Sequence, residues 1–502
     1  MPGTIAQVSI VIEDILAMNV INTAFVVAIK AIVRDLARVY PQLSGQVRVV
    51  RILATANIGD DDLSSAALDG PSRWCLDLNK AHLRRANLAG AKLAGANLTH
   101  ATLESANVEN ASFRDAILNN VHLDFLDLTN LDFSGASLQG ASFRGTNLTQ
   151  TNLRRADMTR AQLESAILDQ SDLSGATLQG ASLRGARFSS TVLRGIRAEY
   201  AILEGVEFLN LSMEAAIFDN CQADNAQFRG SKLARASFRE SNLRGANFHS
   251  ASLVEAVFDD AQCEGATLSH ADLEKASFSR TNLSQADLRH SSLIGASLDG
   301  CILAGAQLAE LDFRSPSLGR VSFGTASLRR AIFTRCELRN VDFHEANLED
   351  ADFRHAELEG ANLRGARMAG ATFRHANLKQ ADLRGAQAGS ADLSGTNLIL
   401  AKASGSSMVG ADFRFSDAIG IDLEKSDIRY SDLRNADFTK SNIATAKLWG
   451  SVVRNTKLPT NMGHMVLVLK LSRMFQGFGS KRQKAKEARE RKRVRQVAEL
   501  VR

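Results

Sequence analysis

The side chains of this chain that could do chemistry recur at a fixed spacing. His290 follows His270 at a spacing of 20, and His375 follows His355 at the same spacing. Two imidazoles bind zinc when a third ligand stands beside them. Guanidinium groups gathered on one face bind anions, and arginines also recur here at multiples of that spacing: Arg314, Arg354, Arg374, Arg414, Arg434 and Arg454. These two sets are the candidates for a metal site and an anion site.

No catalytic constellation accompanies them. The chain contains no glycine-rich nucleotide-binding motif, no zinc-protease motif and no serine-hydrolase motif. Its carboxylates occur at regular outward positions, as in a surface pattern. The sequence therefore predicts no catalytic residue, no bound metal and no cofactor, and a chain that is not an enzyme.

The five cysteines show no CxxC pair and no disulfide framework. Cys221, Cys301 and Cys336 stand where the pattern otherwise has Ala, and Cys263 stands where it has Leu or Phe. We interpret them as small core residues, which fits a reducing cytoplasm. The N-terminus lacks the basic region and the cleavage site of a secretory signal peptide. These observations favour a cytoplasmic protein.

The element that must position all these side chains is a repeat with a period of five. From Leu78 to Leu458 every fifth residue is apolar, which makes 77 central positions, mostly Leu or Phe. The residue two before each is usually Ala, Ser or Thr, as in Ala86-Asn87-Leu88 and Ala381-Asp382-Leu383. No insertion or deletion shifts the five-residue period between Leu78 and Leu458.

A period of five fits neither an α-helix nor a plain strand. In an extended segment the small and central side chains, two places apart, point to the same side. The next two residues are both polar or Gly, which breaks the alternation and requires a turn. Strand and turn in alternation wind the chain into an all-β solenoid whose interior holds only the small and central side chains.

This pattern resembles the pentapeptide-repeat family, whose consensus is Ala-Asp/Asn-Leu followed by two variable residues. The resemblance implies a right-handed quadrilateral β-helix in which four pentapeptides make one coil. The repeats predict about 19 coils over residues 71–460, stacked at ~4.8 Å into a rod roughly 90 Å long. Pro316 stands at a small position and predicts a bend or a missing ladder bond. Ala198 and Ile196 look like an exchange of large and small residues that refills the core.

A coil of four pentapeptides would stack each histidine pair on one face, but neither pair has an evident third ligand, so we predict no metal site. The arginine set shares its face with Asp312, Asp352, Asp392, Asp412 and Asp432. We therefore predict a neutralised salt-bridge ladder there rather than an anion site.

Residues 1–70 read as an N-terminal cap segment, with a long helix over residues 8–39 and a strand over residues 46–54. Its uncharged run, Ile15 to Ile29, is shorter than the ~20 residues of a membrane span. Capping or oligomerisation into a homo-oligomer is the favoured role of this helix, and a membrane span is the alternative.

Residues 461–502 read as an amphipathic segment, Met465 to Phe478, followed by a polybasic tail. Residues 462–502 carry 12 Lys and Arg against 3 Asp and Glu, whereas residues 71–461 are nearly balanced, with 43 against 45. The tail is a candidate contact for an anionic membrane surface, with nucleic acid less favoured. Its basic residues are Lys481, Arg482, Lys484, Lys486, Arg489, Arg491, Lys492, Arg493 and Arg495.

Outward positions near the end of the repeats turn apolar. An exposed apolar patch marks a surface that something covers. We predict a patch that docks either a protein partner or the tail, made of Ile399, Leu400, Val409, Phe415, Ile419, Tyr430 and Trp449.

Together these features predict a cytoplasmic, non-catalytic scaffold that mediates protein–protein interaction, its partner unidentified. One alternative is a scaffold attached to the membrane through the basic tail. The family resemblance supplies another, because some members resemble duplex DNA and bind type II topoisomerases. Such mimicry needs a strongly acidic rod, and this one is balanced in charge.

Overall fold

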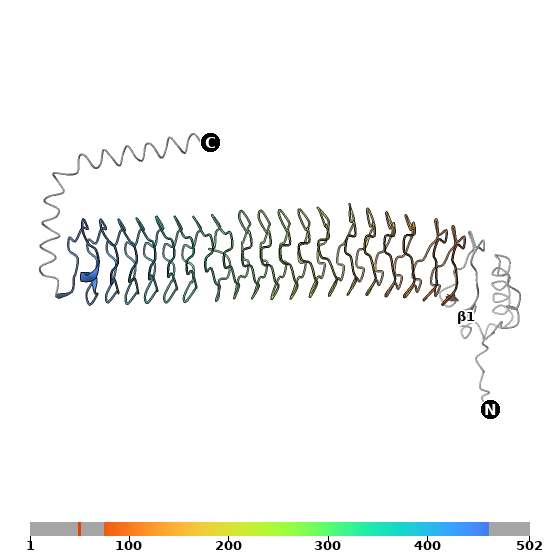
Figure 1. Cartoon of the computed structure of the whole chain (residues 1–502), viewed down its shortest axis with the longest axis horizontal. Helices are drawn as coiled ribbons and strands as arrows, with labels where there is room; N and C mark the ends of the chain where they lie inside the picture. Colours follow the sequence, from red (N-terminus) through yellow and green to blue (C-terminus); the bar gives the residue numbers. More distant parts are fainter. Residues whose placement is uncertain (1–48, 52–74, 461–502) are drawn as a thin grey trace, which may run out of the picture. The chain divides into compact units, whose positions relative to one another are not determined.

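The computed structural model describes residues 49–51 and 75–460, and the chain divides into two units, residues 1–298 and 299–502 (Figure 1). Strands β1 (Val49–Arg51) and β2 (Cys75–Asp77) pair in parallel, with Val50 opposite Leu76. From Leu78 onward, nearly every pentapeptide forms one β-bridge position followed by a tight turn. A short 3-10 helix, η2 (Ile443–Thr445), replaces one of these turns in the second unit.

The bridges show how many pentapeptides make one coil. Each bridging residue pairs in parallel with the residue 20 positions later, as Asn152 does with Asp172 in the first unit and Asp412 with Asp432 in the second. Bridges recur at every fifth position, so a coil has four sides, and the coils of each unit stack side by side in Figure 1. The expected four-sided β-helix with four pentapeptides per coil is confirmed within each unit.

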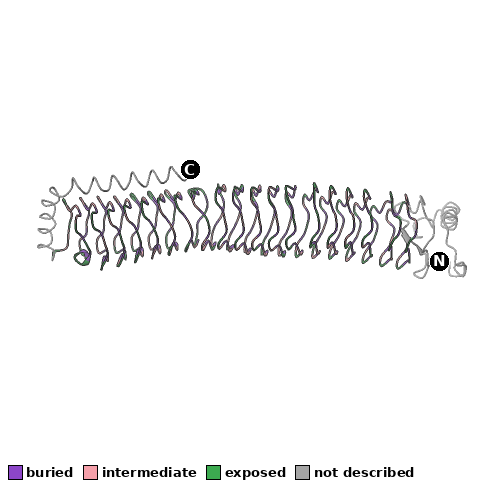
Figure 2. Ribbon diagram, turned by 45° about the horizontal axis from the view of Figure 1, so that its top comes forward, coloured by how far each residue is buried: buried purple, intermediate pink, exposed green. Residues whose placement is uncertain are grey.

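The core of each coil is made of the small and central side chains, and buried positions alternate with exposed ones along the ribbon (Figure 2). Equivalent phenylalanines stack: the rings of Phe228 and Phe248 lie 4.8 Å apart at 3°. Phe238 and Phe248, on adjacent sides of the coil, meet edge to face at 83°. Both are favourable aromatic geometries. The exchange at Ile196 and Ala198 is also confirmed, because their exposures are 1% and 0%.

The conformation of the turns explains which residue types occupy the last two positions of the repeat. The second turn residue has a positive φ, +65° at Gly180 and +57° at Asn210 for example, a conformation that Gly and Asn adopt at little cost. The Asn or Asp before the central residue often accepts the first turn N–H, as Asn247 Oδ1 does from His249 at 3.0 Å. This side-chain bond is the physical reason for Asn and Asp at that place.

Two sides of the first unit depart from the regular ladder. Among the described residues, no bridge and no backbone hydrogen bond joins residues 186–190 to 206–210, or residues 106–110 to 126–130. At the first of these sides the rings of Phe188 and Phe208 are tilted by 35°, unlike the regular stacks.

Bulky side chains occupy small positions at both sides that lack the ladder bonds. Val206 and Leu211 occupy successive small positions at one side, Leu126 and Leu131 do so at the other, and all four are buried. The extra volume of two neighbouring bulky residues holds the segments apart.

The remaining predictions concern the two terminal segments and Pro316. Strand β1 lies within the predicted strand at residues 46–54. The predicted helix at residues 8–39 and the whole tail from residue 461, including its basic residues, lie outside the described residues. Within the described residues no helix is long and apolar enough to cross a membrane. At Pro316 a bend from Arg314 to Pro316 replaces the usual turn, as the missing backbone donor predicts.

Candidate interaction surfaces

One corner of the second unit carries exposed aromatic side chains. Turn residues 409–410, 429–430 and 449–450 are spaced by 20 and so lie on the same corner. The rings of Tyr430 and Trp449 meet edge to face with centroids 5.0 Å apart. Their exposed fractions are 47% and 52%. We call Val409, Tyr430 and Trp449 the aromatic corner.

The other four residues of the predicted patch lie elsewhere. Ile399, Leu400 and Ile419 share a different corner, where Leu400 Cδ2 would lie 2.9 Å from a Cβ added at Gly420. Phe415 occupies a third corner. The prediction of one patch is corrected to three separate groups, because residues five apart in the sequence fall on successive corners. That any of them docks a partner or the tail stays a prediction.

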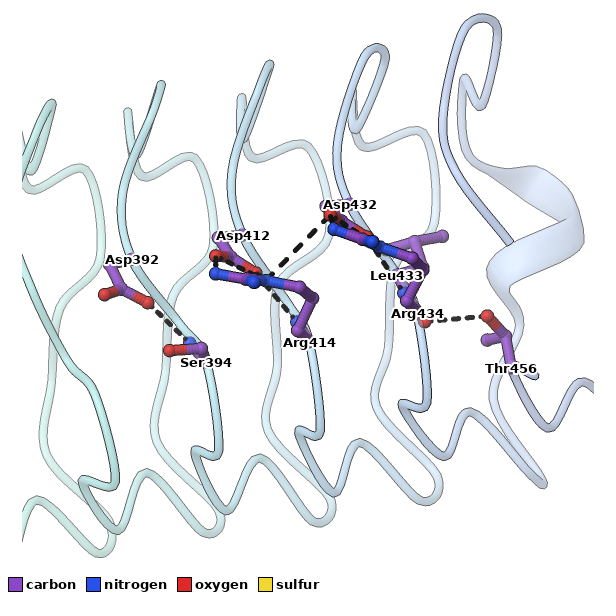
Figure 3. A network of polar contacts seen from close by, with 8 residues as sticks. All are labelled: Asp392, Ser394, Asp412, Arg414, Asp432, Leu433, Arg434 and Thr456. Carbon is purple, nitrogen blue, oxygen red and sulfur yellow. Dashed lines mark hydrogen bonds and ion pairs between the residues drawn. The ribbon is translucent and has the colours of Figure 1, made fainter. Parts of the chain in front are cut away.

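The predicted salt-bridge ladder is present in the second unit (Figure 3). Arg414 donates to Asp412 of its own block at 2.6 Å and reaches Asp432 of the next coil at 3.9 Å. Arg434 bonds Asp432 at 2.6 Å, while Asp392 meets the Ser394 N–H instead. The same pairs form at Asp312–Arg314 and Asp352–Arg354. Among the described residues neither Arg374 nor Arg454 forms an ion pair, since Thr372 and Val452 replace the aspartate.

The tripeptide Asp-x-Arg, with an apolar residue in the middle, forms such pairs on other sides of the coil as well. Asp382 accepts the N–H of Arg384 at 3.1 Å and also its guanidinium at 2.5 Å. The hydrogen bond from Arg384 holds the pKa of Asp382 below its usual value, although partial burial opposes this shift. An equivalent bond lowers the pKa of Asp427 beside Arg429. The Asp-x-Arg tripeptides could have predicted this pairing within one block from the sequence. The prediction above used only the fact that the Arg and Asp residues share a face of the coil.

The histidines stack as their spacing predicts. His270 and His290 have ring centroids 4.8 Å apart, and those of His355 and His375 are 5.3 Å apart. A third ring, His249, meets His270 at 5.4 Å and was missed because it lies one position off the coil spacing. Nowhere in the described residues do three His, Cys, Asp or Glu side chains stand where they could hold a metal ion.

Cys221, Cys263, Cys301 and Cys336 are buried, in agreement with their predicted core positions. Burial raises the pKa of Cys221 to about 12, and that of Cys336 likewise to about 12. Cys336 also donates its thiol to the carbonyl of Phe313 at 3.1 Å. A thiol with so high a pKa is a poor nucleophile.

Two hollows on the first unit were not predicted. One, of about 650 Å³, lies at the open side of the ladder beside the Arg187–Asp169 ion pair. The other, of about 660 Å³, follows a single corner and is lined largely by amide side chains and glycines. Both are open depressions, and the second consists of turn residues that the repeat pattern leaves free to vary.

Comparisons with known proteins agree with the fold. Models of pentapeptide repeats match residues 81–195 and 346–443, and a model of a pentapeptide repeat region matches residues 211–343. No curated protein matches the chain.

Solved structures also resemble it. HetL, a pentapeptide repeat protein involved in heterocyst differentiation regulation in the cyanobacterium Nostoc sp. strain PCC 7120, is 28% identical. The match covers 44% of this chain and 89% of HetL, with a TM-score of 0.21. QnrB1, a plasmid-mediated fluoroquinolone resistance protein, is 15% identical over 54% of this chain and 96% of its own, with a TM-score of 0.18.

A pentapeptide repeat protein of the Arabidopsis thaliana thylakoid lumen is 30% identical over 24% of this chain and 67% of its own, with a TM-score of 0.12. The family models together span well over half of the 502 residues and keep the phase of the bridges. The chain belongs to the pentapeptide-repeat family.

Proposed function

We propose that this protein is a non-catalytic cytoplasmic scaffold that binds a protein partner through the aromatic corner. The observation that carries the proposal is the contact between Tyr430 and Trp449, two half-exposed aromatic rings. Large aromatic side chains that stay partly exposed are enriched at the centres of protein interfaces. The neighbouring turn residues Gly410 and Gly450 leave no side chain to shield these rings.

Charge supports the same conclusion. The Asp-x-Arg pairs around the coils of the second unit neutralise one another, as at Asp432 and Arg434. Exposed pairs of this kind contribute little to binding or stability. A partner of this unit is therefore expected to gain its affinity from apolar contact rather than from charge.

The test is affinity capture from the native host with the full chain and two variants. Trp449→Ala removes one of the two rings of the aromatic corner. Phe125→Ala is the matched control, because Phe125 is an aromatic residue of another corner and is 81% exposed. We expect a partner that the wild type and Phe125→Ala retain and Trp449→Ala loses. Equal recovery with both variants would show that the aromatic corner is not the interface.

A second candidate function is attachment to an anionic membrane through the basic tail, motivated by its 12 basic against 3 acidic residues. A cluster of Lys and Arg binds anionic lipid, and the binding weakens with salt. The test is co-sedimentation with phosphatidylserine vesicles of the full chain and of a chain ending at Leu458. Equal sedimentation of both chains would exclude the tail.

The topoisomerase alternative is disfavoured by the pairing of the carboxylates, because a DNA mimic needs them free. Its test is a gyrase supercoiling assay with excess protein, in which we expect no inhibition.

A further inference from the structure

The second hollow follows one corner of the first unit, formed by turn residues 119–120, 139–140, 159–160, 179–180 and 199–200. We call this the amide corner. The side chains that line the hollow carry amides, hydroxyls and one guanidinium, and Tyr200 closes it at one end. The lining consists of Asn119, Asn120, Gln139, Gly140, Thr159, Arg160, Gln179, Gly180 and Tyr200.

The second turn residue of this corner alternates between a side chain and none. Asn120, Arg160 and Tyr200 alternate with Gly140 and Gly180 along the stack. Coils are spaced by ~4.8 Å, so the pattern repeats about every 10 Å. The aliphatic part of Arg160 leans over Gly180, where an added Cβ would meet its Cγ at 3.5 Å. Exposed Gln139 and Gln179 stand beside the two glycines. Asn120 Oδ1 likewise leans over Gly140, 2.5 Å from such a Cβ. The corner is thus a row of shallow dips at the glycines, each partly covered by the side chain of the preceding coil and edged by amides.

Most backbone N–H groups of the amide corner are already bonded. The N–H groups of Asn120, Gly140, Arg160 and Gly180 all donate to carbonyls of the next coil, at 2.8 Å each. A peptide strand therefore finds no free edge to pair with. A ligand of this corner therefore finds its hydrogen-bond donors mainly on side chains.

Those side chains are available and almost uncharged. Gln139 donates to Asp157 at 2.6 Å. Within the described residues, neither its amide oxygen nor the side-chain amides of Asn120 and Gln179 make a hydrogen bond. Arg160 is the sole charged residue among those that line the hollow. One cation is too few to hold a nucleic acid strand, which is bound through several phosphate contacts. The chemistry suits a neutral ligand that both donates and accepts hydrogen bonds.

We infer that the amide corner binds an extended, uncharged oligosaccharide. Its hydroxyl groups bond the amides of Gln139, Gln179 and Asn120, each of which donates and accepts. The apolar face of one sugar packs on the ring of Tyr200, which is 59% exposed. An extended chain that presents the same edge at every second sugar fits the alternation of dips and side chains. This binding does not depend on the protein partner proposed above.

The experiment is calorimetric titration of the full chain with cellohexaose, an extended neutral hexasaccharide. Gly180→Asn fills a dip, and Asn adopts the required positive φ of +65° as it does at Asn210 and Asn220. Gly195→Asn is the matched control, because Gly195 has a φ of +62° and open space around it on another corner. Circular dichroism and the melting temperature of each variant check the fold.

We expect saturable binding that Gly195→Asn keeps and Gly180→Asn weakens about tenfold or more. Tyr200→Ala should weaken it about tenfold, while Tyr430→Ala should leave it unchanged. Gln179→Ala, which adds no bulk, should also weaken it and serves if Gly180→Asn fails to fold. Absence of saturable binding would overturn the inference. Equal affinity of the Gly180→Asn and Gly195→Asn variants, or tighter binding of coiled maltohexaose than of cellohexaose, would overturn it as well.

Discussion

The ring of Phe188 lies 5.0 Å from that of Phe208 but is tilted by 35°, whereas the next ring of the column, Phe228, stacks on Phe208 at 16°. The tilt marks a side of the first unit where successive coils are not joined by backbone bonds. Most small positions of this unit hold Ala, Ser or Thr. Here the small positions hold the larger Val206 and Leu211, and their extra volume keeps the two coils too far apart to form the ladder bonds.

Replacing Val206 with Ala should let this ladder close. Among the described residues, the backbone N–H groups of Phe188 and Ser190 donate to no carbonyl, and they should then gain protection from hydrogen exchange. Each bond gained contributes about 1 kcal/mol, which offsets the lost apolar burial. The measurement is hydrogen exchange of the segment 186–191, read by mass spectrometry.

Val341→Ala is the matched control for that change. Val341 holds the same place in its block and is 2% exposed, but its ladder is intact, with Asp342 bridged to both neighbouring coils. This variant should lose about 2 kcal/mol without gaining protection. Unchanged exchange at residues 186–191 in the Val206→Ala chain would refute the steric cause.

The Asp-x-Arg pairs should make the second unit sensitive to acid. The pKa of Asp382 is lowered in the folded chain by its bond from Arg384. Its stabilisation is therefore complete above the unfolded value of about 3.9 and is lost as the pH falls through the lower folded value. Asp382→Asn should remove this stabilisation at neutral pH and so flatten the acid dependence, and because Arg384 is half-exposed the loss should be about 1 kcal/mol or less. Urea unfolding from neutral to acidic pH measures the effect.

Asp392→Asn supplies the comparison, because Asp392 faces Ser394 and no guanidinium of its own block (Figure 3). In both variants the new amide oxygen still accepts the turn N–H, as Asn362 does from Arg364. The two variants should differ in their acid dependence. Identical curves would mean that the Asp382–Arg384 pair does not carry it.

The buried thiols should resist alkylation. Burial raises the pKa of both Cys221 and Cys336 to about 12, so almost no thiolate forms at about pH 8. N-ethylmaleimide should leave both unlabelled in the folded chain and label both after denaturation, as resolved by peptide mass spectrometry. Ser165→Cys, at an exposed turn, is the positive control. Rapid labelling of Cys221 in the folded chain would contradict the observed burial.

The three groups of the predicted patch should behave independently. Tyr430 and Trp449 are in ring contact, so a double-mutant cycle of their Ala variants should show a coupling of about 0.5–1.5 kcal/mol in stability. Phe415 and Trp449 stand on different corners, and their cycle should show no coupling beyond about 0.5 kcal/mol. A large coupling between Phe415 and Trp449 would restore the single patch.

Much of the fold was readable from the sequence because burial inside a coil depends only on the place within each block of five. Every central residue from Leu78 to Leu448 is buried. Even the swap of a large residue into the small position at Ile196 and a small one into the central position at Ala198 follows from the need to fill a fixed core volume. The Asp and Arg residues that share a face were readable for the same reason. The phase of the repeat by itself therefore determined which side chains make the core and which face outward.

Which outward residues meet was decided only by the tertiary structure. The pattern of five is the same for any number of sides, and the coil closes after four because the positive-φ turns set the angle between sides. That closure separates Phe415 from Trp449, brings His249 to His270, and aligns the amides beside Gly140 and Gly180. The open ladder at Val206 likewise depends on contact between coils, because a bulky residue is tolerated at one small position and not at another.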